Sequence, residues 1–255
     1  MQLPGWHYDE LRQVGVDFDS IDQVAAYDAK QGSNLQAELT LIERLGIAPG
    51  AVVVDLGCGT ASFALAAARH GARVLAVDIS QAMLDHAQRK ANAEHLSEIE
   101  FHRAGFLTFN PRPGAVDFIV TRFALHHLPD FWKQVALIRL AAMLRPKGKL
   151  FLRDVSFSFP PREYERAISE WVERMPRISG YAREEFETHV REEHSTFAWV
   201  LEGMLERAGF EIVESLRPAA EYAEWVCSRS SRVGISAGSR RDGRGGGHPR
   251  SRSGR

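Results

Sequence analysis

The sequence contains little cysteine and no long apolar run. Its 255 residues include only two cysteines, so a disulfide framework is not indicated and a reducing compartment fits best. Charged residues interrupt every apolar run well short of the roughly 18 residues that a membrane span needs. The N-terminus lacks the basic and apolar regions of a secretory signal peptide. We therefore expect a cytoplasmic protein with no contact with membranes.

The chain also lacks a strong net charge, because its 32 Lys and Arg residues are nearly balanced by 33 Asp and Glu residues. This balance gives no general attraction to nucleic acid or to membrane surfaces. The charge is uneven, since residues 229–255 hold eight arginines and one aspartate among Gly and Ser. Such a segment cannot bury enough apolar surface to fold. We expect a disordered tail there, whose weak binding would be the only contact with nucleic acid.

From residue 51 the chain alternates short β-rich runs with Ala-rich helical patterns. This alternation predicts an α/β fold with a doubly wound, mostly parallel sheet. The expected strands are 51–55, 73–78, 98–103, 115–123, 148–155, 210–216 and 221–228. The expected helices between them are 62–70, 80–92 with Ser80 as N-cap, 130–144 and 194–209. A sheet of seven strands follows from this count.

Helical patterns also occur outside the alternating region. Residues 5–46 are mostly helical in pattern and should form a covering element. Pro160 and Pro161 break the chain after the fifth strand, and two amphipathic helical patterns follow. The predicted parts are an N-terminal helical cover over 1–37, a sheet domain over 38–228, an inserted helical lid over 156–193 and the tail over 229–255.

The stretch "VVVDLGCGTASFAL" (52–65) is the first candidate site. Gly57 and Gly59 lie between a predicted strand and helix, where ligands of parallel sheets bind and where glycine lets a ligand approach the main chain. Ser62 replaces the third glycine of a dinucleotide motif, although Asp78 keeps NAD possible. Asp55, just before the turn, disfavours a pyrophosphate and favours a cationic or amino-bearing ligand. S-adenosylmethionine fits these demands.

Four motifs together resemble the class I S-adenosylmethionine-dependent methyltransferase family, in particular its small-molecule methyltransferase-domain members. They are "VVVDLGCGT" (52–60), "VLAVDIS" (74–80), "VDFIVTRFALHHLPD" (116–130) and "MLRPKGKLFLRDV" (143–155). The resemblance covers roughly residues 38–155. It implies a Rossmann-like fold and methyl transfer from S-adenosylmethionine to a small-molecule acceptor by in-line displacement.

The resemblance also implies which residues bind the cofactor. The turn with Gly57 and Gly59 would cradle the methionine part, and Asp78 would hold both ribose hydroxyls. Ile79 and Met83 would pack on the adenine, and the end of the fourth strand would lie near the reactive methyl. The full set is Tyr27, Asp55, Gly57, Cys58, Gly59, Thr60, Asp78, Ile79, Met83, Gly105, Phe106, Thr121, Arg122 and Phe123.

Two positions depart from the family pattern. Ala61 stands where the turn usually has its third glycine. The stretch "HRAGFLTF" (102–109) lacks the acidic residue that family members often use to bind the adenine amino group. Gly105 and Phe106 stand there, so we expect the adenine to rest on backbone N–H groups and on the Phe106 ring.

The chemistry predicts few catalytic residues. A sulfonium is an activated leaving group, so the protein mainly aligns the reactants and excludes water. A hydroxyl or protonated amine acceptor must also lose a proton, which histidine can accept near neutral pH. His127 and Asp154 are the candidates. No metal site is expected, because His189 and His194 are spaced five residues apart and do not share a helix face.

Two other functions stay open from the sequence. The same fold could serve an NAD(P)-dependent oxidoreductase, or the chain could be a non-catalytic regulatory protein that binds S-adenosylmethionine. The segment "TRFA" (121–124) differs from the Asn/Asp-Pro-Pro-aromatic tetrapeptide that is usual when base amines of DNA or RNA are methylated. A small-molecule acceptor is therefore favoured, while the sequence assigns no acceptor atom and no oligomeric state.

Overall fold

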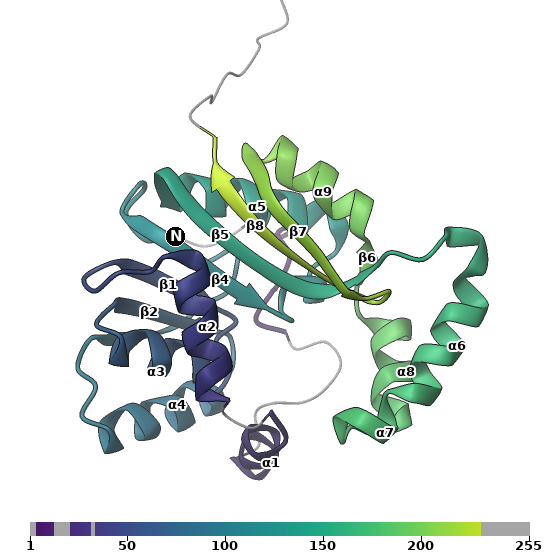
Figure 1. Cartoon of the computed structure of the whole chain (residues 1–255), viewed down its shortest axis with the longest axis horizontal. Helices are drawn as coiled ribbons and strands as arrows, with labels where there is room; N and C mark the ends of the chain where they lie inside the picture. Colours follow the sequence, from purple (N-terminus) through teal and green to yellow (C-terminus); the bar gives the residue numbers. More distant parts are fainter. Residues whose placement is uncertain (1–3, 13–20, 32–33, 231–255) are drawn as a thin grey trace, which may run out of the picture.

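The computed structural model describes residues 4–12, 21–31 and 34–230. Over these residues, seven strands form the main sheet in the order β3-β2-β1-β4-β5-β8-β7, and the short strand β6 pairs with β5 outside this order (Figure 1). The strands are β1 (Val52–Leu56), β2 (Arg73–Asp78), β3 (Ile99–Arg103), β4 (Val116–Arg122), β5 (Leu144–Phe157), β6 (Thr196–Phe197), β7 (Phe210–Ala219) and β8 (Tyr222–Arg229).

The main sheet is mostly parallel. Strands β3, β2, β1, β4 and β5 pair in parallel, whereas β8 runs antiparallel to both β5 and β7. Strand β1 begins with an apolar run, which suits a strand in the middle of the sheet. Its fully buried Val53 and Val54 pack into the cores on opposite faces. The expected doubly wound sheet is thus confirmed.

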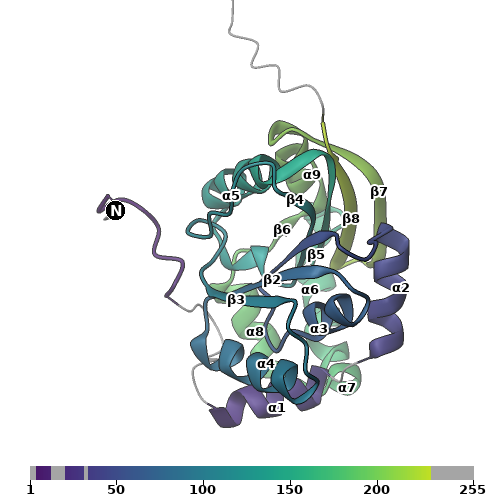
Figure 2. The ribbon, with the colours of Figure 1, turned by 90° about the vertical axis from the view of Figure 1, so that its left-hand side faces the viewer.

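Helices cover both faces of the sheet. One face packs against α2 (Leu35–Leu45), α3 (Ser62–Arg69) and α4 (Gln81–Ala93), and the other against α5 (Asp130–Met143) and α9 (Ala198–Arg207). Figure 2 shows the two groups on opposite sides of the strands. The loops at the carboxyl ends of the parallel strands are left to line a site. In the part of the chain that the structure describes, none of the helices is long and apolar enough to cross a membrane.

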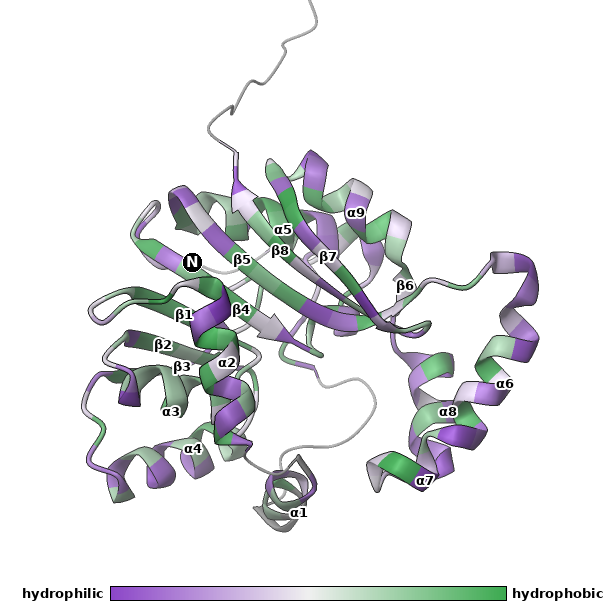
Figure 3. Cartoon of the chain, viewed as in Figure 1, coloured by the Kyte–Doolittle hydropathy of each residue, from purple (hydrophilic) through white to green (hydrophobic). Residues whose placement is uncertain are grey.

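The chain forms a helical unit after β5 and before β6, and this unit lies to one side of the sheet (Figure 1). Trp171 is buried where this unit meets the sheet, and its indole N–H donates to the Tyr222 hydroxyl at 3.2 Å. Hydrophilic and hydrophobic residues alternate along α6 (Figure 3), as in a helix that packs on one side. The helices fall within the expected lid. They are the 3-10 turn Pro161–Glu163, α6 (Tyr164–Arg174), α7 (Pro176–Ser179) and α8 (Arg183–Glu192).

The N-terminal segment is helical over α1 (Ile21–Gln31) and α2, but residues 5–12 do not form a helix. This differs from the mostly helical pattern expected for the segment. The Trp6 ring stacks on Trp132 with centroids 6.4 Å apart, and the Glu10 carboxylate is buried. Because short isolated helices are marginal in water, such tertiary contacts decide the local conformation.

Several element boundaries also differ from the expected ones, among them the end of β7, which reaches Ala219 rather than residue 216. The helix expected from residue 194 begins at Ala198, because the two preceding residues pair with β5. The fifth strand is longer than expected and reaches from Leu144 to Phe157. Arg229 is the last residue of β8 rather than the first of the tail. The rest of the expected tail, beyond Ser230, lies outside the described residues, and the division into domains stays a prediction.

The turn after β1 packs closely on the segment after β4, which predicts different costs for two glycine substitutions. Gly57 has a φ of 75°, and a Cβ there would lie 2.5 Å from the Ala124 Cβ. Gly50 has a φ of 81° with no atom within 4 Å of its would-be Cβ. Gly50→Ala should cost about 1–2 kcal/mol of unfolding free energy through backbone strain. Gly57→Ala should cost about 1–3 kcal/mol more through overpacking. Urea unfolding measures both, and equal losses would contradict this close packing.

Candidate functional site

A cavity opens at the carboxyl ends of β1, β2 and β4, as the fold predicts. It encloses about 920 Å³, including the part open to solvent. Eleven of the predicted site residues line it: Tyr27, Gly57, Gly59, Asp78, Ile79, Met83, Gly105, Phe106, Arg122, Phe123 and His127. The other predicted site residues lie outside its lining: Asp55, Cys58, Thr60, Thr121 and Asp154.

The Asp78 carboxylate joins the end of β2 to the glycine turn. One oxygen accepts the Gly59 N–H at 2.8 Å and the other accepts the Ser80 N–H at 2.9 Å. Burial raises the pKa of Asp78, while these hydrogen bonds oppose the shift. On the other side of the turn, a Cβ on Gly59 would lie 3.7 Å from Cε1 of the Tyr27 ring. Tyr27 of α1 therefore packs on this turn at van der Waals distance, and the positive φ of 52° at Gly59 favours glycine there.

Asp55 lies behind the cavity wall and binds the start of α3. It is buried, and its Oδ2 accepts the Ala64 N–H at 3.2 Å. An N–H group at this helix terminus, which could otherwise bind an anion, is thus taken by the protein's own carboxylate. This arrangement supports the expectation that the turn disfavours a pyrophosphate, although by a hydrogen bond to the helix rather than by direct contact with a ligand.

Arg122 and Phe123 form the wall at the end of β4. The Arg122 guanidinium donates two hydrogen bonds of 3.0 Å to the Glu38 carboxylate on α2, so its charge is paired within the protein. Phe123 follows with a φ of 52°, an uncommon conformation for a bulky residue. Its ring lines the cavity and is 38% exposed. This wall therefore offers an aromatic surface rather than a free cation.

Sequence reasoning missed three residues of the N-terminal segment that line the cavity: Tyr8, Glu10 and Arg12. The Glu10 carboxylate accepts the Leu107 N–H, at 2.8 Å to its nearer oxygen, and the Thr108 hydroxyl at 2.7 Å. It fills the space that Gly105 leaves open, where a Cβ would lie 2.6 Å from it. A carboxylate thus stands beside the loop after β3, which has none of its own. No sequence signal connects Glu10 with a loop 97 residues away.

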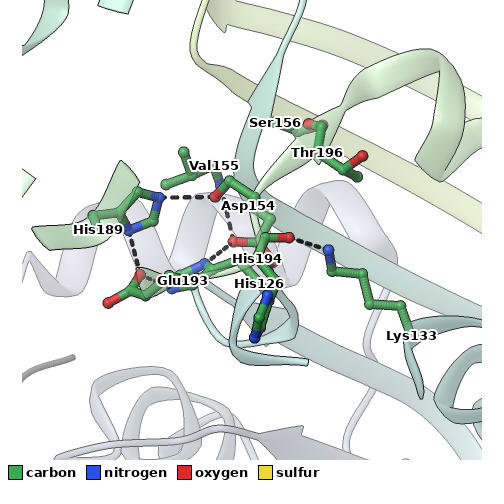
Figure 4. Close-up of polar contacts among 10 residues, drawn as sticks. His126, Lys133, Asp154, Val155, Ser156, His189, Glu193, His194 and Thr196 are labelled. Carbon is green, nitrogen blue, oxygen red and sulfur yellow. Dashed lines mark hydrogen bonds and ion pairs between the residues drawn. The ribbon is translucent and has the colours of Figure 1, made fainter. Parts of the chain in front are cut away.

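Asp154 belongs to a buried ionic network with His126 and Glu193 (Figure 4). Its carboxylate pairs with Nδ1 of the His126 ring and accepts the His126 backbone N–H at 3.0 Å. Nε2 of the same ring lies 3.1 Å from the Glu193 carboxylate. Burial opposes a charge on His126, but the two carboxylates outweigh it and raise the pKa of this ring. Sequence reasoning named Asp154, but it missed His126 as the partner of this carboxylate and Glu193 as the second partner of the same ring.

His127 differs from its neighbour, because it lines the cavity and has no carboxylate paired with it. Burial, followed by the charge of His126, lowers the pKa of His127 to about 3. The ring is therefore neutral near pH 7 and keeps a lone pair. A group with so low a pKa is a weak general base, since the most effective catalytic pKa lies near the working pH. Its chemistry suits a hydrogen-bond acceptor or a ligand.

Comparison with known proteins points to one family. Residues 53–148 match the family model described as "Methyltransferase domain". A ubiquinone biosynthesis O-methyltransferase of Coxiella burnetii is 31% identical over 134 residues, which are 52% of this chain and 56% of that protein. The chain thus spans little more than half the length of the curated relative.

Solved structures show the same fold at low sequence identity. A methyltransferase from Aquifex aeolicus, described as dependent on S-adenosylmethionine, aligns with a TM-score of 0.60 and 18% identity, over 82% of this chain and 98% of that one. A phosphoethanolamine N-methyltransferase of Haemonchus contortus, in complex with S-adenosyl-L-methionine, aligns with a TM-score of 0.63 and 16% identity. This second alignment covers 83% of this chain and 57% of that one.

Asp55 should make the folding stability fall as the pH rises. Burial raises the pKa of its carboxyl to about 7, against 3.8 for an unperturbed group, so the folded chain keeps a proton that the unfolded chain releases. This stabilisation is complete below about pH 4 and is lost as the pH rises through about 7. At 1.36 kcal/mol for each pKa unit, it amounts to about 4 kcal/mol.

Asp55→Asn is the matched variant, because it keeps an oxygen for the Ala64 N–H but does not titrate. Urea unfolding from about pH 5 to 8 should show a smaller loss of stability in this variant than in the wild type. The same pH dependence in both proteins would show that another group titrates.

Proposed function

We propose that this chain is a class I S-adenosylmethionine-dependent methyltransferase, which transfers the methyl group of S-adenosylmethionine to a small-molecule acceptor; the match of residues 53–148 to the methyltransferase-domain model supports this. The observation that carries the proposal is the cavity wall in which Asp78 and the turn of Gly57 and Gly59 meet. A half-buried carboxylate, an approachable backbone and nearby apolar side chains converge there, as a nucleoside with a charged amino-acid end requires.

The cofactor fits this cavity residue by residue. The Asp78 oxygens accept the Gly59 and Ser80 N–H groups at the cavity wall, and a carboxylate has enough lone pairs to accept ribose hydroxyls as well. Gly57 and Gly59 leave the main chain open to the methionine part, with support from behind by Asp55, Cys58 and Thr60. Tyr27 covers the turn, and Thr121, buried at the end of β4, supports the wall of Arg122 and Phe123. These assignments are proposals for individual residues.

The adenine subsite combines the loop after β3 with the N-terminal segment. Ile79, Met83 and Phe106 supply the apolar surface, and Gly105 leaves room beside it. Glu10 brings the carboxylate that the loop lacks, and we assign it to the adenine amino group. The covering segment would thus take part in cofactor binding as well as in excluding water.

Few residues are needed for the reaction itself. The bound cofactor supplies an activated methyl group, which an acceptor atom takes in line with the departing sulfur. Tyr27 and Phe123 exclude water, which protects the aligned reactants. The neutral His127 ring contacts the acceptor, and its low pKa makes it a weak base for removing a proton. Asp154 lies outside the cavity and is a positioning residue, because it orients the neighbouring His126.

A small acceptor is also the class that the site favours. Apolar side chains with a few convergent polar groups line the cavity, as they do in small-molecule sites. The Coxiella relative carries the name of an O-methyltransferase in the biosynthesis of a small molecule. Arg122, the cation in the wall at the end of β4, pairs with Glu38 and offers no free charge to a phosphate backbone.

Asp78→Asn should weaken binding of S-adenosylmethionine and S-adenosylhomocysteine. Loss of hydrogen bonds to a charged acceptor costs about 1.5–3 kcal/mol, so the affinity should fall by at least about tenfold. Asp85→Asn is the matched control, because Asp85 is exposed on the outer side of α4 and does not line the cavity. Isothermal titration calorimetry of each purified protein measures the dissociation constants, with NADH as a further ligand.

Micromolar binding that is lost in Asp78→Asn and kept in Asp85→Asn would support the cofactor assignment and justify a screen of hydroxyl, amine and thiol acceptors. Binding of NADH in place of S-adenosylmethionine would overturn it in favour of an oxidoreductase. Binding of S-adenosylmethionine with no turnover of any acceptor would favour a regulatory protein.

A further inference from the structure

Three histidines and a glutamate gather where the lid meets the loop after β4. His126 and His127 lie in the short 3-10 helix Leu125–His127, whereas His189 lies on α8 and Glu193 directly follows it. Potential ligand atoms of His126, His127 and Glu193 all lie within 4.8 Å of one another. Imidazole nitrogens with one carboxylate form the donor set that zinc and similar divalent transition metals prefer.

The spacing of these donors is close to that of a metal site. The Glu193 oxygen lies 3.1 Å from His126 Nε2, and the same oxygen contacts His189 Nδ1. The rings of His126 and His189 have their centroids 4.9 Å apart. Bonds of about 2.0–2.1 Å in a tetrahedral site place neighbouring donors about 3.3 Å apart. Small side-chain rotations would therefore bring these donors around one ion.

In the rings of His126 and His189, the nitrogen that points away from Glu193 has a polar partner of its own, as in metal-binding histidines. Nδ1 of His126 pairs with the Asp154 carboxylate, which leaves Nε2 facing Glu193 (Figure 4). Nε2 of His189 lies 2.8 Å from the Ser195 hydroxyl, which leaves Nδ1 facing the same oxygen. Such outer partners fix the orientation of a ligand ring. Two rings from distant parts of the chain are thus aimed at one carboxylate.

The third histidine has an unused nitrogen. Nδ1 of His127 is buried without a hydrogen-bond partner in the described part of the chain. A buried polar atom without a partner costs about 1–3 kcal/mol. One nitrogen of the same ring lies within 4.8 Å of donor atoms of His126 and Glu193. A metal ion bound through Nδ1 would give this atom a partner.

We propose that His126, His127, His189 and Glu193 bind a divalent transition-metal ion of the zinc type, which fastens the lid to the cavity wall. Two ligands come from the loop after β4 and two from the end of α8, so the ion would join both elements. The His194 N–H already donates to the His126 carbonyl at 2.8 Å, which shows that the two backbones meet there. Because His127 lines the cavity, the ion would also set the position of that wall.

The ligand set could not be assigned from the sequence, which predicts no metal site. The sequence offers His189 and His194 as the candidate metal-binding pair. His194 meets the cluster through its backbone N–H rather than through its ring. His126 and Glu193 lie 67 positions apart in the sequence. Only the fold brings them together, through the pairing of β5 with both β4 and β6.

Metal content and Co²⁺ binding test the proposal on the full chain, prepared without a polyhistidine tag. Atomic emission measures zinc in the protein as purified, and titration of the apoprotein with CoCl₂ follows the visible absorption of Co²⁺ bound by nitrogen and oxygen. We expect about one ion per chain. Glu193→Gln should weaken Co²⁺ binding by at least about tenfold, and Asp154→Asn by about 10–100-fold.

Two matched controls come from neighbouring residues. Glu192→Gln makes the same change one residue earlier on an exposed side chain, and His194→Gln is the control for His189→Gln. Both controls should bind Co²⁺ as the wild type does, and circular dichroism in EDTA shows which variants fold. Because neither cofactor nor acceptor is present, the result is independent of the proposed methyl transfer.

Absence of Co²⁺ and Zn²⁺ binding by the wild type at micromolar protein would overturn the proposal, whatever the variants do. Equal affinities in Glu193→Gln and Glu192→Gln would also overturn it, since the ion would then bind elsewhere. In either case the cluster is a buried ion-pair network only.

Discussion

The hydrogen bonds that Asp78 accepts are the constraint on which the cavity depends. Gly59 donates from the turn after β1 and Ser80 from the start of α4, so one half-buried carboxylate joins two crossovers of the sheet. A buried carboxylate is stable only when such donors compensate its lost hydration. The same two donors that make its burial possible also hold it at the cavity wall. Structural support and the proposed ribose contact are therefore properties of one side chain.

The opposite wall depends on charges that are buried far from the turn. Asp154 and Glu193 face the His126 ring from two sides, and burial makes either carboxylate costly without that partner. Lys133 extends the network, since its ammonium group binds both Asp130 and the backbone carbonyl of His194. The lid is thus tied to the sheet by polar groups as well as by the apolar contact of Trp171. Such groups require a defined geometry, which a purely apolar contact would not.

The agreement between sequence and structure is closest for the sheet. The run "AVVVD" predicts β1 because four successive apolar residues suit a strand covered on both faces, and "RVLAVD" has the bounds of β2. Ser80 caps α4 as predicted, accepting the Met83 N–H at 3.1 Å. In each case neighbours along the chain decide the conformation. Residues 5–12 are the counterexample, because contacts with Trp132 and Leu107 hold them out of a helix.

The sequence by itself determined the order of strands and helices, the glycine turn and the resemblance to a methyltransferase domain, because these depend on periodicity and on short motifs. Only the tertiary structure decided that Glu10 lies beside Gly105, that Asp55 binds α3 from behind the wall, and that His126 meets Glu193. These contacts join positions 9 to 95 residues apart, for which spacing carries no signal. Strand order and burial bring such side chains together, and burial is also what shifts the pKa values of Asp55 and His127.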